Sequence, residues 1–104
     1  MQALTIEIQV PAVSNVTVSN DSLSVALSDG RTITVPLGWF PRLTYGSQAE
    51  QANWRMTSQG HGIHWDDLDA EISVEGLLAG MPSGESPASL KSWLARRLSQ
   101  MPVF

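Results

Sequence analysis

Apolar residues recur at every second position between residues 12 and 37, which is the pattern of β-strands with one buried face. The alternating residues are Val16, Val18, Leu23, Val25, Leu27, Ile33, Val35 and Leu37. The pairs Asn20-Asp21 and Asp29-Gly30 separate the runs, and both tolerate the positive φ angles of tight hairpin turns. The pattern therefore predicts an antiparallel meander of three strands.

Both ends of this meander carry a further signal. We expect the third strand to end at Pro36 or to lie at a sheet edge there, because proline has no N–H to donate to a neighbouring strand. Residues 2–10 also alternate between apolar and polar positions and indicate another strand.

The period changes after residue 37. Residues 37–54 mix aromatic residues with helix formers and predict one or two short helical turns, with Ser47 as the N-cap of residues 48–53. Residues 54–58 and 62–65 predict a second hairpin with a glycine-rich connection.

Two helices are expected in the last third of the chain. Ser73 is placed to cap a short helix over residues 74–79, which Gly80 ends. Ser86 and Pro87 open a longer helix. The apolar residues of that helix are Leu90, Trp93, Leu94, Leu98 and Met101. They span an arc of about 140°, so we expect the helix to dock on the sheet.

Arg97 falls inside this apolar arc. An unpaired buried charge costs several kcal/mol, so the guanidinium group must extend past the apolar edge or meet a carboxylate. We predict that Arg97 pairs with a carboxylate of residues 66–71, the nearest acidic run.

The composition suits one small globular unit. Of the 104 residues, 42% are hydrophobic and none is cysteine, which excludes disulfide scaffolds, cysteine-ligated metal sites and thiol nucleophiles. A chain of this length buries roughly 60 to 70% of its unfolded surface, enough for one core. We expect a single domain over residues 1–104, of the α+β class. Its small antiparallel sheet, a meander plus the second hairpin, packs against the C-terminal amphipathic helix and short helices.

Charge is unevenly distributed along the chain. Residues 1–85 carry all ten carboxylates and three arginines, a net −7, whereas residues 86–104 carry three basic side chains, a net +3. An acidic body repels the phosphate backbone, so we expect no nucleic acid to bind this chain alone, and it favours a small basic protein as partner. A homo-oligomer is the other assembly that the sequence leaves open.

The hydropathy pattern predicts no membrane segment. Residues 1–10 lack the basic start and apolar stretch of a signal peptide, and no apolar run reaches the roughly 18 residues that cross a bilayer. We therefore expect a cytoplasmic protein.

Histidines and carboxylates gather in one segment. Its members are His61, His64, Asp66, Asp67, Asp69 and Glu71. These residue types suit a divalent metal ion, with His61, His64 and Asp66 as ligands, or acid/base catalysis. In a strand over residues 61–65, however, the two imidazoles point to opposite faces. The carboxylates suit the turn before the helix capped by Ser73, where negative charge is favoured.

No other pattern supports catalysis. None of the serines lies in a Gly-x-Ser-x-Gly motif, and Gly60-His61-Gly62 is too short to cradle a phosphate. We therefore predict that the protein is not an enzyme and carries no cofactor or metal ion.

An aromatic segment lies where the third predicted strand ends. Trp39, Phe40 and Tyr45 flank Pro41 and Arg42. Such rings are either buried in the core or form an exposed apolar patch, which commonly marks a partner site. We predict Trp39, Phe40, Arg42 and Tyr45 as partner contacts.

Four stretches of the chain resemble one bacterial family. They are ITVPLGWFPRL (33–43), NWRM (53–56), GHGIHWDDLDAEISVEGLLAG (60–80) and GESPASLKSWLARR (84–97). Together they are similar to the small bacterial family catalogued as domain of unknown function 2442. The motif residues are Ile63, His64, Trp65, Asp69 and Ser73, and Arg97 lies in the last stretch. Asp66 and Ala70 depart from the commoner proline and glutamate.

The resemblance implies a compact α+β domain, similar to the N-terminal domain of a two-domain bacterial protein whose other half is a helix-turn-helix domain. It also implies an antitoxin-like role, because such genes often neighbour a family suspected of toxin activity, and it carries over no catalytic residue. The sequence thus favours a non-enzymatic protein–protein interaction module, either antitoxin-like or a regulatory subunit. The alternative is a small-ligand or metal-binding protein that uses residues 61–69.

Overall fold

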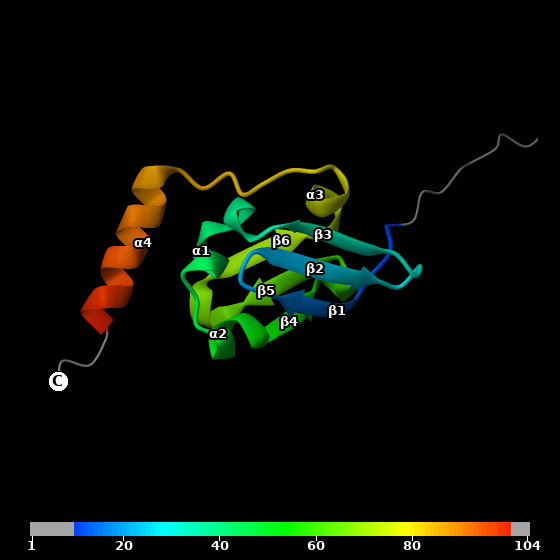
Figure 1. The fold of residues 1–104 in the computed structure, drawn as a ribbon, viewed down its shortest axis with the longest axis horizontal. Coiled ribbons are helices and arrows are strands. Elements are labelled where there is room, and N and C mark those ends of the chain that lie inside the picture. Colours follow the sequence, from blue (N-terminus) through cyan, green and yellow to red (C-terminus); the bar gives the residue numbers. More distant parts are fainter. Residues whose placement is uncertain (1–9, 101–104) are drawn as a thin grey trace, which may run out of the picture.

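The computed structural model describes residues 10–100, which form two antiparallel sheets of three strands each, with helices at their ends (Figure 1). The strand expected over residues 2–10 lies outside the described residues. The first sheet has the order β1 (Val13–Val18), β2 (Ser22–Leu27), β3 (Thr32–Pro36). The second has the order β4 (Trp54–Thr57), β5 (Gly62–Trp65), β6 (Ala70–Ser73). The helices are α1 (Pro41–Thr44), α2 (Gln48–Ala52), α3 (Val74–Leu78) and α4 (Pro87–Gln100), and the 3-10 turns are η1 (Leu37–Trp39), η2 (Ser58–Gly60) and η3 (Asp66–Leu68).

The predicted meander is confirmed. Strand β2 pairs with both neighbours, and the turn between β2 and β3 places Gly30 at φ 92°, a conformation that glycine adopts without steric cost. The register of β1 shifts between Val13 and Asn15, which is a β-bulge. The bulge places Val13 and Val16, three positions apart, on the same buried face, and Val18 at the end of the strand is half-buried.

The predicted second hairpin, β4–β5, is also confirmed, but β6 was not predicted. Residues 66–71 were assigned to a turn because of their carboxylates. Only η3 forms that turn, and the chain then extends so that Ile72 pairs with Ile63 of β5. The alternation of Leu68, Ala70, Ile72 and Val74 was a signal for this strand, which the charges between these residues obscured.

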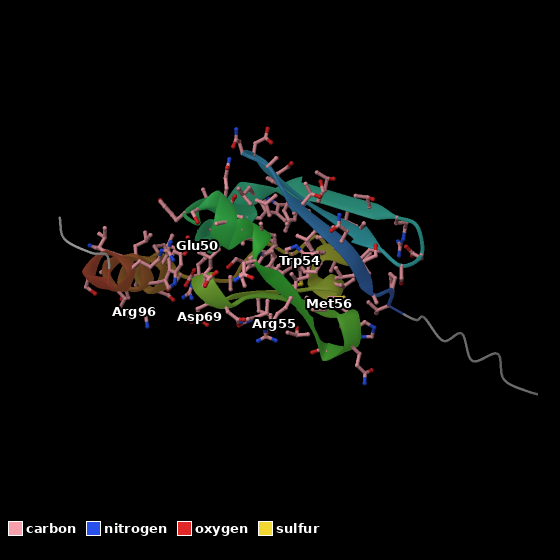
Figure 2. The ribbon with its side chains drawn as sticks, turned by 90° about the horizontal axis from the view of Figure 1, so that it is seen from below. Glu50, Trp54, Arg55, Met56, Asp69 and Arg96 are labelled. Carbon is pink, nitrogen blue, oxygen red and sulfur yellow. The ribbon has the colours of Figure 1, made fainter. Side chains whose placement is uncertain are left out.

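The two sheets face each other and enclose the core (Figure 2). Leu23 and Val25 of β2 and Ile63 and Trp65 of β5 are all 0% exposed. The indole N–H of Trp65 donates to the Gln51 carbonyl oxygen at 2.9 Å, so this large ring is buried with its polar atom satisfied. The predicted α+β class, with helices packed around a small antiparallel structure, is confirmed.

The predicted helix caps are confirmed. The Ser47 hydroxyl accepts from the Glu50 N–H at 3.1 Å, and the Glu50 carboxylate accepts in return from the Ser47 N–H at 2.9 Å. The Ser73 hydroxyl accepts from the Gly76 N–H at 2.9 Å at the start of α3. At the start of α4, the Ser86 hydroxyl accepts from the Ser89 N–H at 3.1 Å. Each cap satisfies a backbone donor that the first turn leaves free.

Helix α4 lies beyond the ends of the strands rather than over a sheet face (Figure 1), so its expected place of docking was wrong. Trp93 is its one buried side chain among residues 87–99, at 5% exposure, whereas Leu98 is 71% exposed. Within residues 10–100, no helix combines the length and apolar character needed to span a bilayer.

Two guanidinium groups hold the Trp93 ring. The Cζ atoms of Arg42 and Arg97 lie 5.1 and 4.8 Å from the ring centroid, which are cation–π distances. We call the set of Arg42, Glu50, Glu85, Trp93 and Arg97 the Trp93 latch. It joins α4 to the rest of the protein through side chains from four different segments.

Arg97 pairs with a different carboxylate from the one predicted. Its guanidinium donates to Glu50 of α2 at 2.8 and 3.2 Å, and its one contact with residues 66–71 is the Asp67 carbonyl oxygen at 3.4 Å. The prediction of a paired cation was correct, but its partner was wrong because α4 lies beside α2 at the end of the sheets. The hydrogen bond from Arg97 lowers the pKa of the Glu50 carboxyl group.

Arg42 connects the latch to the segment before α4. Its Nε donates to both Glu85 oxygens at 2.9 Å, and the two side chains are only 17% and 11% exposed. These hydrogen bonds lower the pKa of Glu85 and raise that of Arg42. The pair therefore fixes residues 81–85 against α1.

The first test of this arrangement removes the ring of the latch. We expect Trp93→Ala to detach α4, because this substitution removes both cation–π contacts and the one buried apolar anchor. Amide hydrogen exchange in α4 should accelerate at least about tenfold while exchange in β2 and β5 stays unchanged. Leu98→Ala, on the same helix but exposed, is the control and should leave the exchange of α4 as in the wild type. Equal protection of α4 in both variants would contradict the latch.

A second test uses pH. Because the folded-state pKa of Glu85 is lowered, its stabilisation is complete above the unfolded pKa of about 4.3 and is lost as pH falls through the folded value. Glu85→Gln should therefore lower the free energy of unfolding by about 1 kcal/mol at pH 7. At pH values where the carboxyl group is protonated, variant and wild type should converge. Urea unfolding at pH 7 and at acidic pH measures the free energy of unfolding of the variant and the wild type. The control is Glu75→Gln, which changes an exposed carboxylate of α3. If Glu85→Gln lowers the free energy of unfolding equally at both pH values, the stabilising role of the Glu85–Arg42 ion pair is refuted.

Candidate functional site

The four predicted contact residues lie in consecutive turns at one end of the first sheet. Phe40 is buried at 9% exposure, Trp39 and Arg42 are half-buried, and Tyr45 is 56% exposed. Phe40 and Arg42 turn toward β6, where they line a hollow. Their role as partner contacts stays a prediction.

Two adjoining hollows run along the outer edge of β6. They measure about 240 and 520 Å³ and share the lining residues Phe40, Glu71, Ile72 and Ser83. Residues 81–85 form the far wall, which the hydrogen bond from the Ser83 N–H to the Trp39 carbonyl oxygen holds in place at 2.9 Å. We call this hollow, between β6 on one side and residues 40–43 and 81–85 on the other, the β6 groove.

The backbone of β6 leaves hydrogen-bonding groups at the groove. The Val74 N–H donates to the His61 carbonyl oxygen at 2.9 Å, and antiparallel pairs alternate between bonded and non-bonded. It follows that Ile72 bonds to β5, whereas the N–H and C=O of Glu71 point away from β5, into the groove. The Asp69 carbonyl oxygen points the same way and accepts from Arg42 Nη1 at 2.8 Å. Arg42 thus covers the Asp69 end of the β6 edge, whereas the backbone N–H and C=O of Glu71 face the groove.

Carboxylates dominate the charge around the groove. Asp69 and Glu85 line its smaller hollow, and Glu75 of α3 lines the larger one, whereas the Glu71 carboxylate accepts from Thr57 on the outer face of the second sheet. Arg42 is the one basic side chain in either lining, and Glu85 already pairs with it. The groove therefore presents an excess of negative charge over an apolar floor of Phe40 and Ile72.

The structure does not bring the two histidines together. His61 is exposed and lies beside Asp29 and residues 10–12. His64 is on the outer face of β5, with Nε2 at 3.2 Å from Asp66 and Nδ1 at 3.8 Å from Glu71. Over residues 10–100, no group of three His, Cys, Asp or Glu side chains could hold a metal ion. The alternative site of His61, His64 and Asp66 is thus not formed.

The carboxylates near His64 are engaged in surface pairs. Arg55 donates to Asp66 at 3.0 Å and thereby lowers the pKa of that exposed carboxyl group, and the Thr57 hydroxyl donates to Glu71 at 3.1 Å. Figure 2 shows Arg55 on the side of β4 that faces away from the first sheet. These side-chain contacts stabilise the outer face of the second sheet, as cross-strand pairs do.

The other motif residues have structural roles in the core, in a turn and in a helix cap. Ile63 and Trp65 are core residues, Ser73 caps α3, and Asp69 adopts the left-handed conformation at φ 48° where η3 turns into β6. Aspartate tolerates this conformation better than most residues. Residues 68–74 thus encode a tight turn, an edge strand and a helix cap.

Sequence reasoning missed three parts of the groove: β6, Ser83 and Glu85. The alternation within residues 68–74 could have revealed β6. Residues 81–85 have no periodicity, and nothing in the local sequence indicates that Glu85 meets Arg42, which lies 43 positions earlier.

Comparisons with known proteins agree with this fold. The sequence profile of the family described as "Protein of unknown function (DUF2442)" matches residues 13–83. The crystal structure of a protein of unknown function from Rhodospirillum rubrum ATCC 11170 is similar at a TM-score of 0.60 and 28% identity, covering 75% of this chain and 94% of that one. The solution structure of an uncharacterized protein from Chromobacterium violaceum has a TM-score of 0.60 at 15% identity, covering 86% of this chain and 79% of that one, which shows a shared fold. No curated protein matches the sequence.

The matched range contains both sheets and the first three helices and ends before α4. It includes the motif residues Ile63, His64, Trp65, Asp69 and Ser73. Because residues 13–83 make up more than half of the 104-residue chain, the protein belongs to the DUF2442 family.

Proposed function

We propose that this protein is a non-enzymatic protein–protein interaction module, acting as an antitoxin-like or regulatory subunit. The observation that carries the proposal is the open edge of β6 beside a groove to which two predicted contact residues, Phe40 and Arg42, contribute. An unpaired strand edge is a template for pairing with another chain unless the protein covers it. Here residues 81–85 border the groove but leave it hollow.

The engagement of the titratable side chains supports a binding role over a catalytic one. Arg42, Arg55 and Arg97 each pair with a carboxylate that also fixes two segments of the fold to each other. A catalytic group needs its proton or lone pair available to a substrate, and these groups are committed to ion pairs. The family and both similar structures are described as of unknown function, and none of these descriptions names an enzyme.

The proposed partner is a small basic protein in the cytoplasm. Residues 1–85 carry ten carboxylates against three arginines, and a field of this sign steers a basic partner toward the body of the protein. A second copy of this chain has the same acidic body, so self-association through this surface is opposed by like charge.

The test begins in the native host. A tagged copy of the full chain is recovered with its bound protein, which is identified by mass spectrometry, purified and titrated by calorimetry. Tyr45→Ala, at an exposed ring, and Trp39→Ala, at a half-buried one, should each weaken the complex at least about tenfold, since aromatic residues commonly dominate the binding energy of interfaces.

Met56→Ala provides the matched control. Met56 is 53% exposed, close to the 56% of Tyr45, but it lies on β4. Its substitution should leave the dissociation constant within about twofold. The proposal fails if no stoichiometric partner is recovered, or if all three variants bind as tightly as the wild type.

A further inference from the structure

We infer that the β6 groove receives an extended, positively charged segment of the partner, which joins the second sheet as a fourth strand beside β6. This inference rests on the proposed function and specifies which surface binds and what chemistry it takes. Strand addition is a common mode of peptide recognition, in which backbone hydrogen bonds supply affinity and alternate side chains supply specificity.

The backbone geometry meets the first requirement of strand addition. The N–H and C=O of Glu71 face the groove, and the N–H of Ser73, two residues along β6, points to the same side. An added strand would lie about 4.8 Å from β6. The space beside this edge is open, because the far wall of the groove is formed by residues 81–85 and not by another strand.

The floor of the groove suits alternate apolar side chains. Phe40 and Ile72 lie at the junction of the two hollows at 9% and 5% exposure, and Met81 lines the larger hollow at 62% exposure. An extended segment directs every second side chain to one face. Apolar side chains on that face would cover Met81 and pack on the floor, which removes apolar surface from water.

Charge selects the other side chains of the segment. Three carboxylates border the groove: Asp69, Glu75 and Glu85. The single guanidinium group, Arg42, pairs with Glu85 and lies 3.4 Å from the Asp69 carboxylate, so one positive charge faces three negative charges and the groove keeps an excess of negative charge. Lysine or arginine at alternate positions of the segment complements this excess.

The segments of this chain itself fit the groove less well. Residues 1–10 alternate in polarity but contain Glu7 and no lysine or arginine. The basic residues Lys91, Arg96 and Arg97 belong to α4, a helix, which cannot add to a sheet edge. Charge therefore favours a basic segment from another protein over a segment of this chain.

The probe for this inference is an acetylated heptapeptide of alternating lysine and valine with a fluorescent label. Its binding to the full-length protein is followed by fluorescence anisotropy at low salt. We expect saturable binding of one peptide per chain. A peptide with glutamate in place of lysine should bind at least about tenfold more weakly. The same loss is expected when the N–H groups facing β6 are methylated, because these groups make the strand pairing.

Variants of the protein locate the bound peptide. Glu75→Lys should weaken binding of the lysine peptide about tenfold, since it reverses charge beside the groove. Asp21→Lys makes the same charge reversal in the turn between β1 and β2, at a residue that lines neither hollow of the groove, and should change binding by less than about twofold. Circular dichroism confirms that each variant is folded.

Each result supports or overturns the inference. Equal binding of the lysine and glutamate peptides, or equal effects of Glu75→Lys and Asp21→Lys, would overturn it. A dimer by light scattering that no longer binds the peptide would show that a second copy occupies the groove and would overturn the inference.

The outcomes also separate the inference from the proposed function. If the native partner binds and depends on Tyr45 while the lysine peptide does not bind, the inference fails and the proposed function stands. If no native partner is recovered but the peptide binds, the proposed function fails instead.

Discussion

Arg42 connects three parts of this protein through one guanidinium group. It lies against the Trp93 ring of α4, pairs with Glu85 in the segment before that helix, and donates to the Asp69 carbonyl oxygen where β6 begins. A cation with 17% of its side chain exposed needs such partners, because burial without them would cost several kcal/mol. The position of α4, the far wall of the groove and the accessible length of β6 thus all depend on how this one charge is satisfied.

The edges of the two sheets follow from their size. Three short strands cannot bury both faces, so each sheet uses its inner face to cover the other, and the outer strands remain edges. The four edge strands differ: β1 carries a bulge, which disrupts regular pairing, whereas β3, β4 and β6 pair in regular register. The β6 edge also borders the groove, with its apolar floor and its excess of negative charge.

The matched range of the family ends at residue 83, so the latch joins the family fold to a helix outside it. Arg42 and Glu50 lie within the matched range, and Glu85, Trp93 and Arg97 lie beyond it. Trp93 is the buried side chain of α4, and Leu90 and Leu94 of the same helix pack against the core while half-buried. The two ion pairs of the latch complete the attachment of α4 to the two sheets.

The sequence by itself determined the local elements of this protein. Alternation predicted β1 to β3, and the glycine-rich connection between residues 54–58 and 62–65 predicted the β4–β5 hairpin. Serine caps predicted the starts of α2, α3 and α4, and the motif around Trp65 pointed to the family. Each of these features depends on residues a few positions apart. The same alternation was present in β6, but the charges of Asp69 and Glu71 hid it.

Only the tertiary structure decided which distant charges meet. The pairing of Arg42 with Glu85, the partner of Arg97 and the existence of the β6 groove all depend on where α4 and residues 81–85 lie relative to the sheets. An ion pair forms wherever packing brings two charges within reach, and its free energy is too small to leave a pattern in the local sequence. The residues of the groove were therefore visible in the sequence, whereas their arrangement was not.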